Sequence, residues 1–162
     1  MPVYVAVCGA GEASAEMAEQ AEEIGRLLAR SGAVVVCGGL GGVMEAAARG
    51  AAEEGGTSLG ILPGIGREDG NLHLTLSIPT GMGEMRNTLI VRAADVLIAV
   101  GGEFGTLSEV AFALKTGVPV VGLGTWELAK AGQPVDAFPR AASAEEAVEE
   151  ALRLAARISR RA

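Results

Sequence analysis

Two segments of the chain combine a short apolar run with glycines and a glutamate, a combination that can bind an anion. Residues 34–45 are VVVCGGLGGVME, and residues 96–109 are VLIAVGGEFGTLSE. A short β-branched run is typical of a strand buried on both faces, and glycine after it lets backbone N–H groups approach a ligand closely. The helix expected next presents its positive end to negative charge. Both segments therefore predict a site for a phosphate-bearing ligand.

The second segment also carries groups that could take part in catalysis. Thr106 supplies a hydroxyl. Glu109 is expected in the first turn of the next helix, where the dipole favours an ionised carboxylate. A carboxylate beside C1′ of a ribose can stabilise the positive charge that develops when an N-glycosidic bond breaks, or orient the attacking water. Arg86 could pair with a phosphate or assist the leaving base. A helix-start carboxylate with no other role is the alternative for Glu109.

Alternating strands and helices must position these groups. Apolar runs predict strands at residues 3–8, 33–37, 57–62, 73–78, 95–100 and 118–123, with 73–78 a possible edge strand. Helical spacing and caps predict helices at residues 14–30, 41–54, 83–93, 105–116 and 143–159, and residues 124–139 are expected to be irregular. This alternation with short loops indicates a parallel sheet with helices on both faces. We therefore predict a doubly wound, Rossmann-like α/β fold, with residues 1–162 as a single domain.

Charge and composition exclude several classes of function. The chain has a formal net charge of -7, whereas a nucleic-acid-binding surface would be basic, so no nucleic-acid partner is expected. Apolar runs too short for a membrane span, and the lack of a basic region before the first of them, predict a cytoplasmic protein without a membrane partner. Cys8 and Cys37 do not have the spacing of a metal site, so no metal is expected.

Common nucleotide motifs are incomplete in this chain. Residues 9–14, GAGEAS, are similar to a dinucleotide fingerprint but end in serine, and the next strand ends in Cys37 and Gly38 with no acid to bind a ribose. No P-loop motif is present, and the lysines are Lys115 and Lys130. We therefore expect no NAD(P) dehydrogenase, P-loop NTPase or pyridoxal phosphate enzyme, and no bound cofactor.

Three segments taken together resemble a known family. Residues 34–64, residues 81–87 (GMGEMRN) and residues 95–114 resemble the LOG ("lonely guy") proteins, cytokinin-nucleotide phosphoribohydrolases that were long misnamed lysine decarboxylases. A bacterial subgroup of LOG-like Rossmann proteins, to which the algal molybdenum cofactor carrier protein is similar, resembles the chain still more closely. The resemblance extends over roughly residues 3–123.

The resemblance assigns roles to individual residues. The family pattern has an arginine on the third helix and PGGxGTxxE after the following strand, which implies that Arg86 and Glu109 are the catalytic pair. The resemblance and the two glycine segments together give the expected phosphate- or nucleotide-binding residues: Gly9, Gly38, Gly39, Gly41, Gly42, Gly101, Gly102, Gly105 and Thr106. Three positions depart from the family pattern, because Gly101 replaces its proline, Asn87 the lysine after the arginine, and Glu103 a glycine.

Two functions of different class remain open. One is a phosphoribohydrolase that releases a base from a nucleoside 5′-monophosphate. The other is a carrier that holds a nucleotide-like or pterin-phosphate ligand, such as molybdenum cofactor, without turnover. The resemblance also implies a homodimer or higher homo-oligomer, for which Met85, Leu89 and Val91 on the third helix offer apolar surface.

Overall fold

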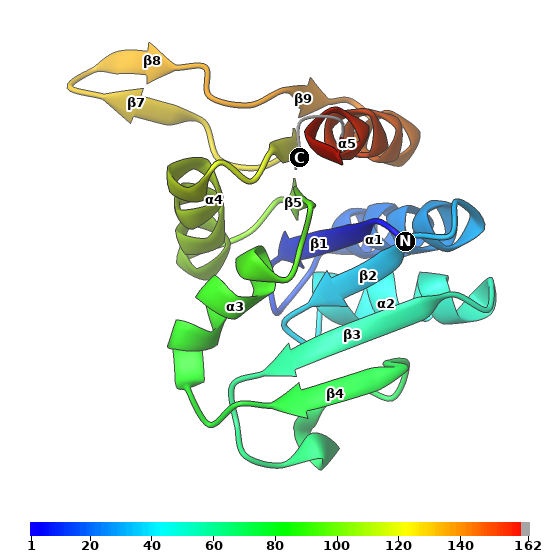
Figure 1. Ribbon diagram of the computed structural model, residues 1–162. Coiled ribbons are helices and arrows are strands. Elements are labelled where there is room, and N and C mark those ends of the chain that lie inside the picture. The colour runs from blue at the N-terminus through cyan, green and yellow to red at the C-terminus, as the bar shows by residue number, and fades with distance from the viewer. Residues whose placement is uncertain (160–162) are drawn as a thin grey trace.

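A seven-stranded parallel sheet forms the centre of the computed structural model, which describes residues 1–159 (Figure 1). Its strands are β1 (Tyr4–Gly9), β2 (Val34–Cys37), β3 (Thr57–Leu62), β4 (Leu76–Pro79), β5 (Val96–Val100), β6 (Val120–Leu123) and β9 (Arg140–Ala141). They lie in the order β4-β3-β2-β1-β5-β6-β9. The chain therefore builds outward from β1 to β4 and then returns to place β5 on the other side of β1. In doubly wound folds, ligands bind where the strand order reverses in this way.

Helices cover both faces of this sheet. The α-helices are α1 (Ala15–Arg30), α2 (Val43–Glu53), α3 (Asn87–Arg92), α4 (Phe104–Thr116) and α5 (Ala144–Ser159), and the 3-10 turns are η1 (Arg67–Asp69) and η2 (Gly83–Arg86). Alternate residues of β1 separate the two layers: Val5 and Val7 pack with α1, α2 and α5, whereas Ala6 and Cys8 pack with α3 and α4. The prediction of a doubly wound, Rossmann-like α/β fold is confirmed.

Three predicted segments differ in detail. The helix expected at residues 83–93 is the 3-10 turn η2 followed by the short α3, and positive φ occurs at Gly81 in the preceding loop and at Gly83, the first residue of η2. The edge strand starts at Leu76 instead of residue 73. Residues 124–139, expected to be irregular, contain the hairpin strands β7 (Leu128–Lys130) and β8 (Gln133–Val135). Ala131 and Gly132 turn this hairpin with positive φ, and alanine gives no sequence signal for such a turn.

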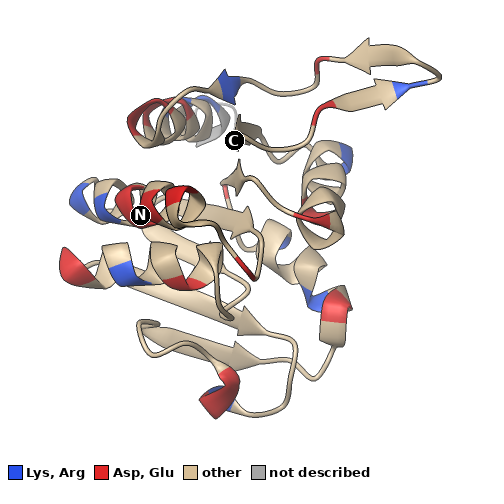
Figure 2. Ribbon diagram, turned by 180° about the vertical axis from the view of Figure 1, so that it is seen from behind, with Lys and Arg blue, Asp and Glu red and all other residues tan. Residues whose placement is uncertain are grey.

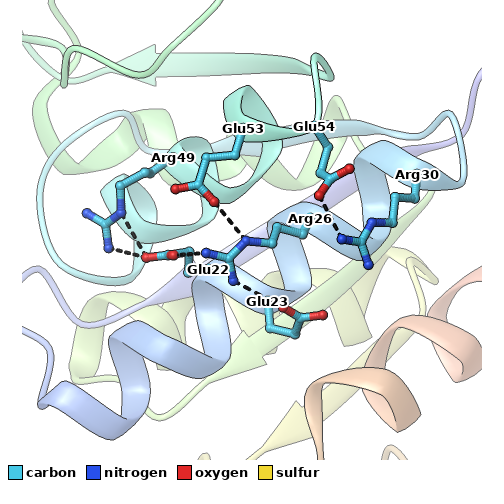
Figure 3. A network of polar contacts seen from close by, with 7 residues as sticks. All are labelled: Glu22, Glu23, Arg26, Arg30, Arg49, Glu53 and Glu54. Carbon is cyan, nitrogen blue, oxygen red and sulfur yellow. Dashed lines mark hydrogen bonds and ion pairs between the residues drawn. The ribbon is translucent and has the colours of Figure 1, made fainter.

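Helices α1 and α2 cross at close range because glycines face backbone at the crossing. A Cβ on Gly25 would overlap the carbonyl of Ala47, and one on Gly50 would overlap the carbonyl of Glu22. Ion pairs join the outer sides of the same helices in the network drawn in Figure 3, which consists of Glu22, Glu23, Arg26, Arg30, Arg49, Glu53 and Glu54. The two helices thus form one unit on their face of the sheet.

Charged residues lie on the helices, on the loops and on the short strands β7 and β9, whereas strands β1 to β6 contain none (Figure 2). This distribution is expected for strands buried between two helical layers. Among the described residues, no helix combines the length and the apolar character needed to cross a membrane.

Candidate functional site

A cavity of about 220 Å³ opens at the carboxyl ends of the central strands. It lies at the strand-order reversal, because β1, the β2–α2 loop, η2 and the start of α4 all contribute to its wall. Its lining includes Cys8, Gly9, Gly38, Arg86, Asn87, Gly105, Thr106 and Glu109. The structure thus brings together Arg86 and Glu109, which lie 23 residues apart in the sequence and which the resemblance assigns to one site.

The guanidinium of Arg86 is buried and held on three sides by the protein. Its Nε donates to the carbonyl of Ile61 at 2.9 Å, and its Nη2 donates to the carbonyl of Gly38 at 3.3 Å. Its Nη1 donates to the side-chain Oδ1 of Asn87. Only 5 % of Arg86 is exposed. The arginine therefore joins the carboxyl ends of β2 and β3 to α3, while its charge remains beside the cavity.

The carboxyl of Glu109 is also buried, and its pKa is raised to about 7. Burial is the main cause, and a hydrogen bond with the Cys8 thiol and the positive charge of Arg86 oppose it. The expectation that a first-turn position keeps this group ionised is wrong. Helix α4 begins at Phe104, so Glu109 lies in the second turn, beyond the strongest influence of the dipole.

Cys8 is the partner of Glu109 in this buried corner. Burial raises the pKa of the Cys8 thiol well above its ordinary value, and the adjacent Glu109 carboxyl raises it further. The thiol therefore remains protonated near neutral pH, where it can donate a weak hydrogen bond to the carboxyl. The position of Cys8 in a predicted strand does not by itself indicate this pairing.

The loop between β5 and α4 depends on two glycines with positive φ. Gly101 has φ of 54° and Gly102 has φ of 102°. Proline, with φ near −65°, cannot adopt the conformation of Gly101, so the departure from the family's proline has a local structural meaning. A Cβ on Gly102 would overlap the side chain of Thr106, which is buried against the loop. The Glu103 side chain is exposed, borders the cavity and does not cap α4.

The glycines of the first segment have different surroundings. Gly9 and Gly38 line the cavity, whereas Gly39 packs on Leu62. Gly41 and Gly42 lie against the β1–α1 loop, where a Cβ on Gly42 would overlap the carbonyl of Ala10. That carbonyl also accepts a hydrogen bond from the N–H of Val43, the first residue of α2. The start of α2 is therefore partly capped by protein backbone, and the start of α4 faces the cavity more openly.

Asn87 links the arginine to α4 and was not expected among the site residues. Its amide Nδ2 donates to Ser108 Oγ at 3.1 Å, and Ser108 Oγ donates to the carbonyl of Gly105 at 2.6 Å. This chain of hydrogen bonds connects Arg86 to the glycine at the start of α4. The family's lysine at this position would not supply the acceptor that Asn87 offers to Arg86. The departure from the family pattern was the signal in the sequence, but it does not reveal Ser108 as a partner, because Ser108 lies 21 residues further along the chain.

Comparison with known proteins agrees with this architecture. Residues 2–155 match the SLOG cluster4 family. The chain belongs to that family. An uncharacterized protein of Archaeoglobus fulgidus is 46% identical over 121 residues, which cover 75% of this chain and 80% of the relative.

Two solved structures extend the likeness beyond the SLOG cluster4 match. The molybdenum cofactor binding protein of the phototrophic bacterium Rippkaea orientalis has a TM-score of 0.84 and 35% identity, covering 93% of this chain and 95% of its own. The molybdenum cofactor carrier protein of Chlamydomonas reinhardtii has a TM-score of 0.81 and 31% identity, covering 96% of this chain and 99% of its own. The expected resemblance to LOG-like proteins near the carrier subgroup is confirmed.

Proposed function

We propose that this protein binds and carries a small phosphate-bearing ligand of nucleotide-like or pterin type, and that it does not turn the ligand over. The observation that carries this proposal is the state of Arg86 and Glu109. The arginine donates to three protein acceptors, and the carboxyl is buried beside the Cys8 thiol. Both groups therefore shape the wall of the cavity more than they offer free reactive atoms. The likeness to two molybdenum cofactor proteins supports the same class of ligand.

The start of α4 is the proposed place for the phosphate. The first amides of a helix lack intrahelical acceptors, and the helix dipole favours an anion there. Gly105 and Thr106 lie in this first turn and line the cavity, while Gly101 and Gly102 form the loop before it. The positive charge of Arg86 is placed to balance the anion from across the cavity. Molybdenum cofactor, which has a pterin and a phosphate, is a cargo of this class.

Hydrolysis is the second candidate, and one observation favours it. A carboxyl with a pKa of about 7 can exchange a proton near neutral pH, as a general acid or base must. In this role Glu109 and Arg86 would act as the catalytic pair in release of a base from a nucleoside 5′-monophosphate. We place this candidate second because the carboxyl is engaged with Cys8 and largely buried.

Mass spectrometry of ligands that copurify with the protein tests the proposal. We expect a phosphate-bearing heterocyclic ligand, and we expect to recover it intact after incubation with the purified protein. Release of a free base together with ribose 5-phosphate would establish the hydrolase instead. Failure to bind any phosphate-bearing ligand, including ribose 5-phosphate at millimolar concentration, would contradict both candidates. A cytoplasmic location and a lack of nucleic-acid partners remain predictions from the sequence.

A further inference from the structure

A second cavity, of about 410 Å³, adjoins the first. Ala10 and Glu103 border both cavities, so the two meet at the loop before α4. The first cavity alone is smaller than the roughly 300 to 1,000 Å³ of typical small-molecule sites. A complete nucleotide-like ligand with its phosphate at the start of α4 therefore exceeds the usual capacity of the first cavity, and the second cavity supplies adjoining room.

The wall of the second cavity contains a fixed aromatic ring. The indole N–H of Trp126 donates to the carbonyl of Glu103 at 3.2 Å, and the ring packs on Phe104 with centroids 5.4 Å apart. Trp126 is half-buried in this position. Met17 lies opposite the β5–α4 loop in the same lining, with its thioether against Gly101. A flat ring can lie between such groups with little loss of side-chain freedom, because the indole is already held.

The polar side chains of this lining are either negatively charged carboxylates, which accept hydrogen bonds, or neutral hydroxyls. Glu12 and Glu103 contribute carboxylates, and Ser14 and Thr125 contribute hydroxyls. The described residues that line this cavity include no arginine or lysine. A second phosphate would therefore be repelled here, whereas an amino group on a ring would find acceptors.

We propose that this second cavity binds the ring end of the ligand, and that it selects an amino-substituted heteroaromatic ring. The proposal rests on the proposed function, since it assumes that the phosphate lies at the start of α4. Trp126 supplies the stacking surface and Glu12 accepts a hydrogen bond from the exocyclic amino group. Glu103 borders both ends of the ligand, so its charge favours the amino group and opposes the phosphate.

Calorimetric titration with three probes tests this assignment. The probes are adenosine 5′-monophosphate, purine riboside 5′-monophosphate, which lacks the amino group, and ribose 5-phosphate, which lacks the ring. We expect Trp126→Ala to weaken binding of adenosine monophosphate by roughly ten-fold or more, the effect typical of losing base stacking on an aromatic side chain. Binding of ribose 5-phosphate should not change, which also shows that the variant is folded. Trp126→Phe, the matched control, should retain most of the affinity.

The Glu12→Ala variant tests whether the protein recognises the amino group of the ring. Glu12→Ala should weaken binding of adenosine monophosphate by about five-fold, as for loss of a hydrogen bond to a charged group at an exposed site, and should leave purine riboside monophosphate unchanged. Equal affinity of wild type and Trp126→Ala for adenosine monophosphate would overturn the assignment. Weaker binding of adenosine monophosphate in Met85→Ala, with no such weakening in Trp126→Ala, would also overturn it, because Met85 lines a different cavity beside Phe112. If wild-type protein binds none of the three probes, this inference is overturned, whereas the proposed function is decided separately by the ligand that copurifies with the protein.

Discussion

The carboxyl of Glu109 holds its proton up to near-neutral pH because burial outweighs two opposing influences. The Cys8 thiol and the guanidinium of Arg86 both favour the ionised form, yet the pKa still rises to about 7 from an ordinary value of 4.5. Since the unfolded chain releases this proton first, the buried carboxyl makes folding depend on pH. Below pH 4.5 both states are protonated, and the full stability is present.

The first prediction follows from this difference in pKa. As pH rises from about 4.5 to about 7, the free energy of unfolding should fall by about 3 kcal/mol, at about 1.4 kcal/mol per unit of pKa shift. Glu109→Gln cannot ionise and should remove this part of the pH dependence, so it should be more stable than wild type at pH 8. Urea unfolding at pH 5 and pH 8 measures both effects. Parallel pH profiles for the two proteins would show that Glu109 ionises freely in the folded state.

At the scale of elements, the crossing of α1 and α2 determines how closely the helices pack. Gly50 is placed where its own Cα faces the carbonyl of Glu22, and Gly25 has the same relation to Ala47. Glycine is unfavourable in a helix interior, so close approach of the backbones is the physical reason for these two residues. The sequence pattern predicted both helices, but a glycine in a helix does not reveal which carbonyl it faces.

Gly50→Ala should destabilise the protein although alanine is the better helix former. Relief of the overlap requires the helices to move apart, and overpacking of this kind costs about 2 kcal/mol after the gain in helix propensity. Gly105→Ala is the matched control, because the nearest atom to its added Cβ is the Asn87 amide nitrogen at 4.0 Å. Urea unfolding followed by the fluorescence of Trp126 compares the two. If Gly105→Ala lowered the free energy of unfolding as much as Gly50→Ala does, the explanation of the helix crossing would be contradicted.

At the surface, the Glu22 carboxylate of α1 accepts hydrogen bonds from Arg49 of α2 and so joins the two helices. It accepts from Arg49 Nε at 2.8 Å and Nη2 at 2.5 Å, and from Arg26 on its own helix (Figure 3). The bond from Arg49 is the main reason that the pKa of Glu22 is lowered. Its contribution to stability is therefore present above the unfolded-state pKa and is lost as pH falls through the folded-state value.

Glu22→Gln should lower the free energy of unfolding by about 1 kcal/mol or less at low salt, because the pair is only partly removed from water. The loss should shrink at about 1 M salt, where screening is strong. Glu150→Gln removes an ion pair within α5 and serves as the comparison, with a smaller expected loss. Unfolding curves for both variants at two salt concentrations decide the matter. An effect of Glu22→Gln that is unchanged by salt would point to packing instead of charge.

At the scale of the whole molecule, strand and helix order could be predicted because each element has its own local pattern. The runs at β1, β5 and β6 are apolar over their whole length, and the resemblance placed Arg86 and Glu109 in one site. The contacts that shape the site could not be predicted in this way. Asn87 and Ser108 meet across two elements, and burial of Glu109 depends on packing around it. Such contacts depend on the assembled fold, which a single sequence pattern does not encode.

Oligomer formation is the prediction that belongs to the whole molecule. We expect a homodimer or larger homo-oligomer through the exposed apolar side chains of Met85, Leu89 and Phe104, whereas Val91 lies in the core and cannot contribute. Leu89→Asp should shift the species seen by light scattering at micromolar concentration toward monomer. Val135→Asp, on the hairpin, should have no such effect. Wild-type protein that is monomeric under these conditions would refute the expectation.

The return of the chain to β1 has a consequence for how the protein is made. The backbone N–H of Tyr4 donates to the carboxylate of Asp95, 91 residues later in the chain. The lining of the cavity likewise combines Cys8 with Thr106 and Glu109. The site is therefore incomplete until α4 has been synthesised, because the segments up to β4 leave one edge of β1 unpaired and lack Thr106 and Glu109. A ligand that binds only the finished site stabilises the folded state by mass action, and this stabilisation grows with the logarithm of its concentration above the Kd. If the proposed ligand binds, we expect complete chains to resist proteolysis more than chains shortened before α4.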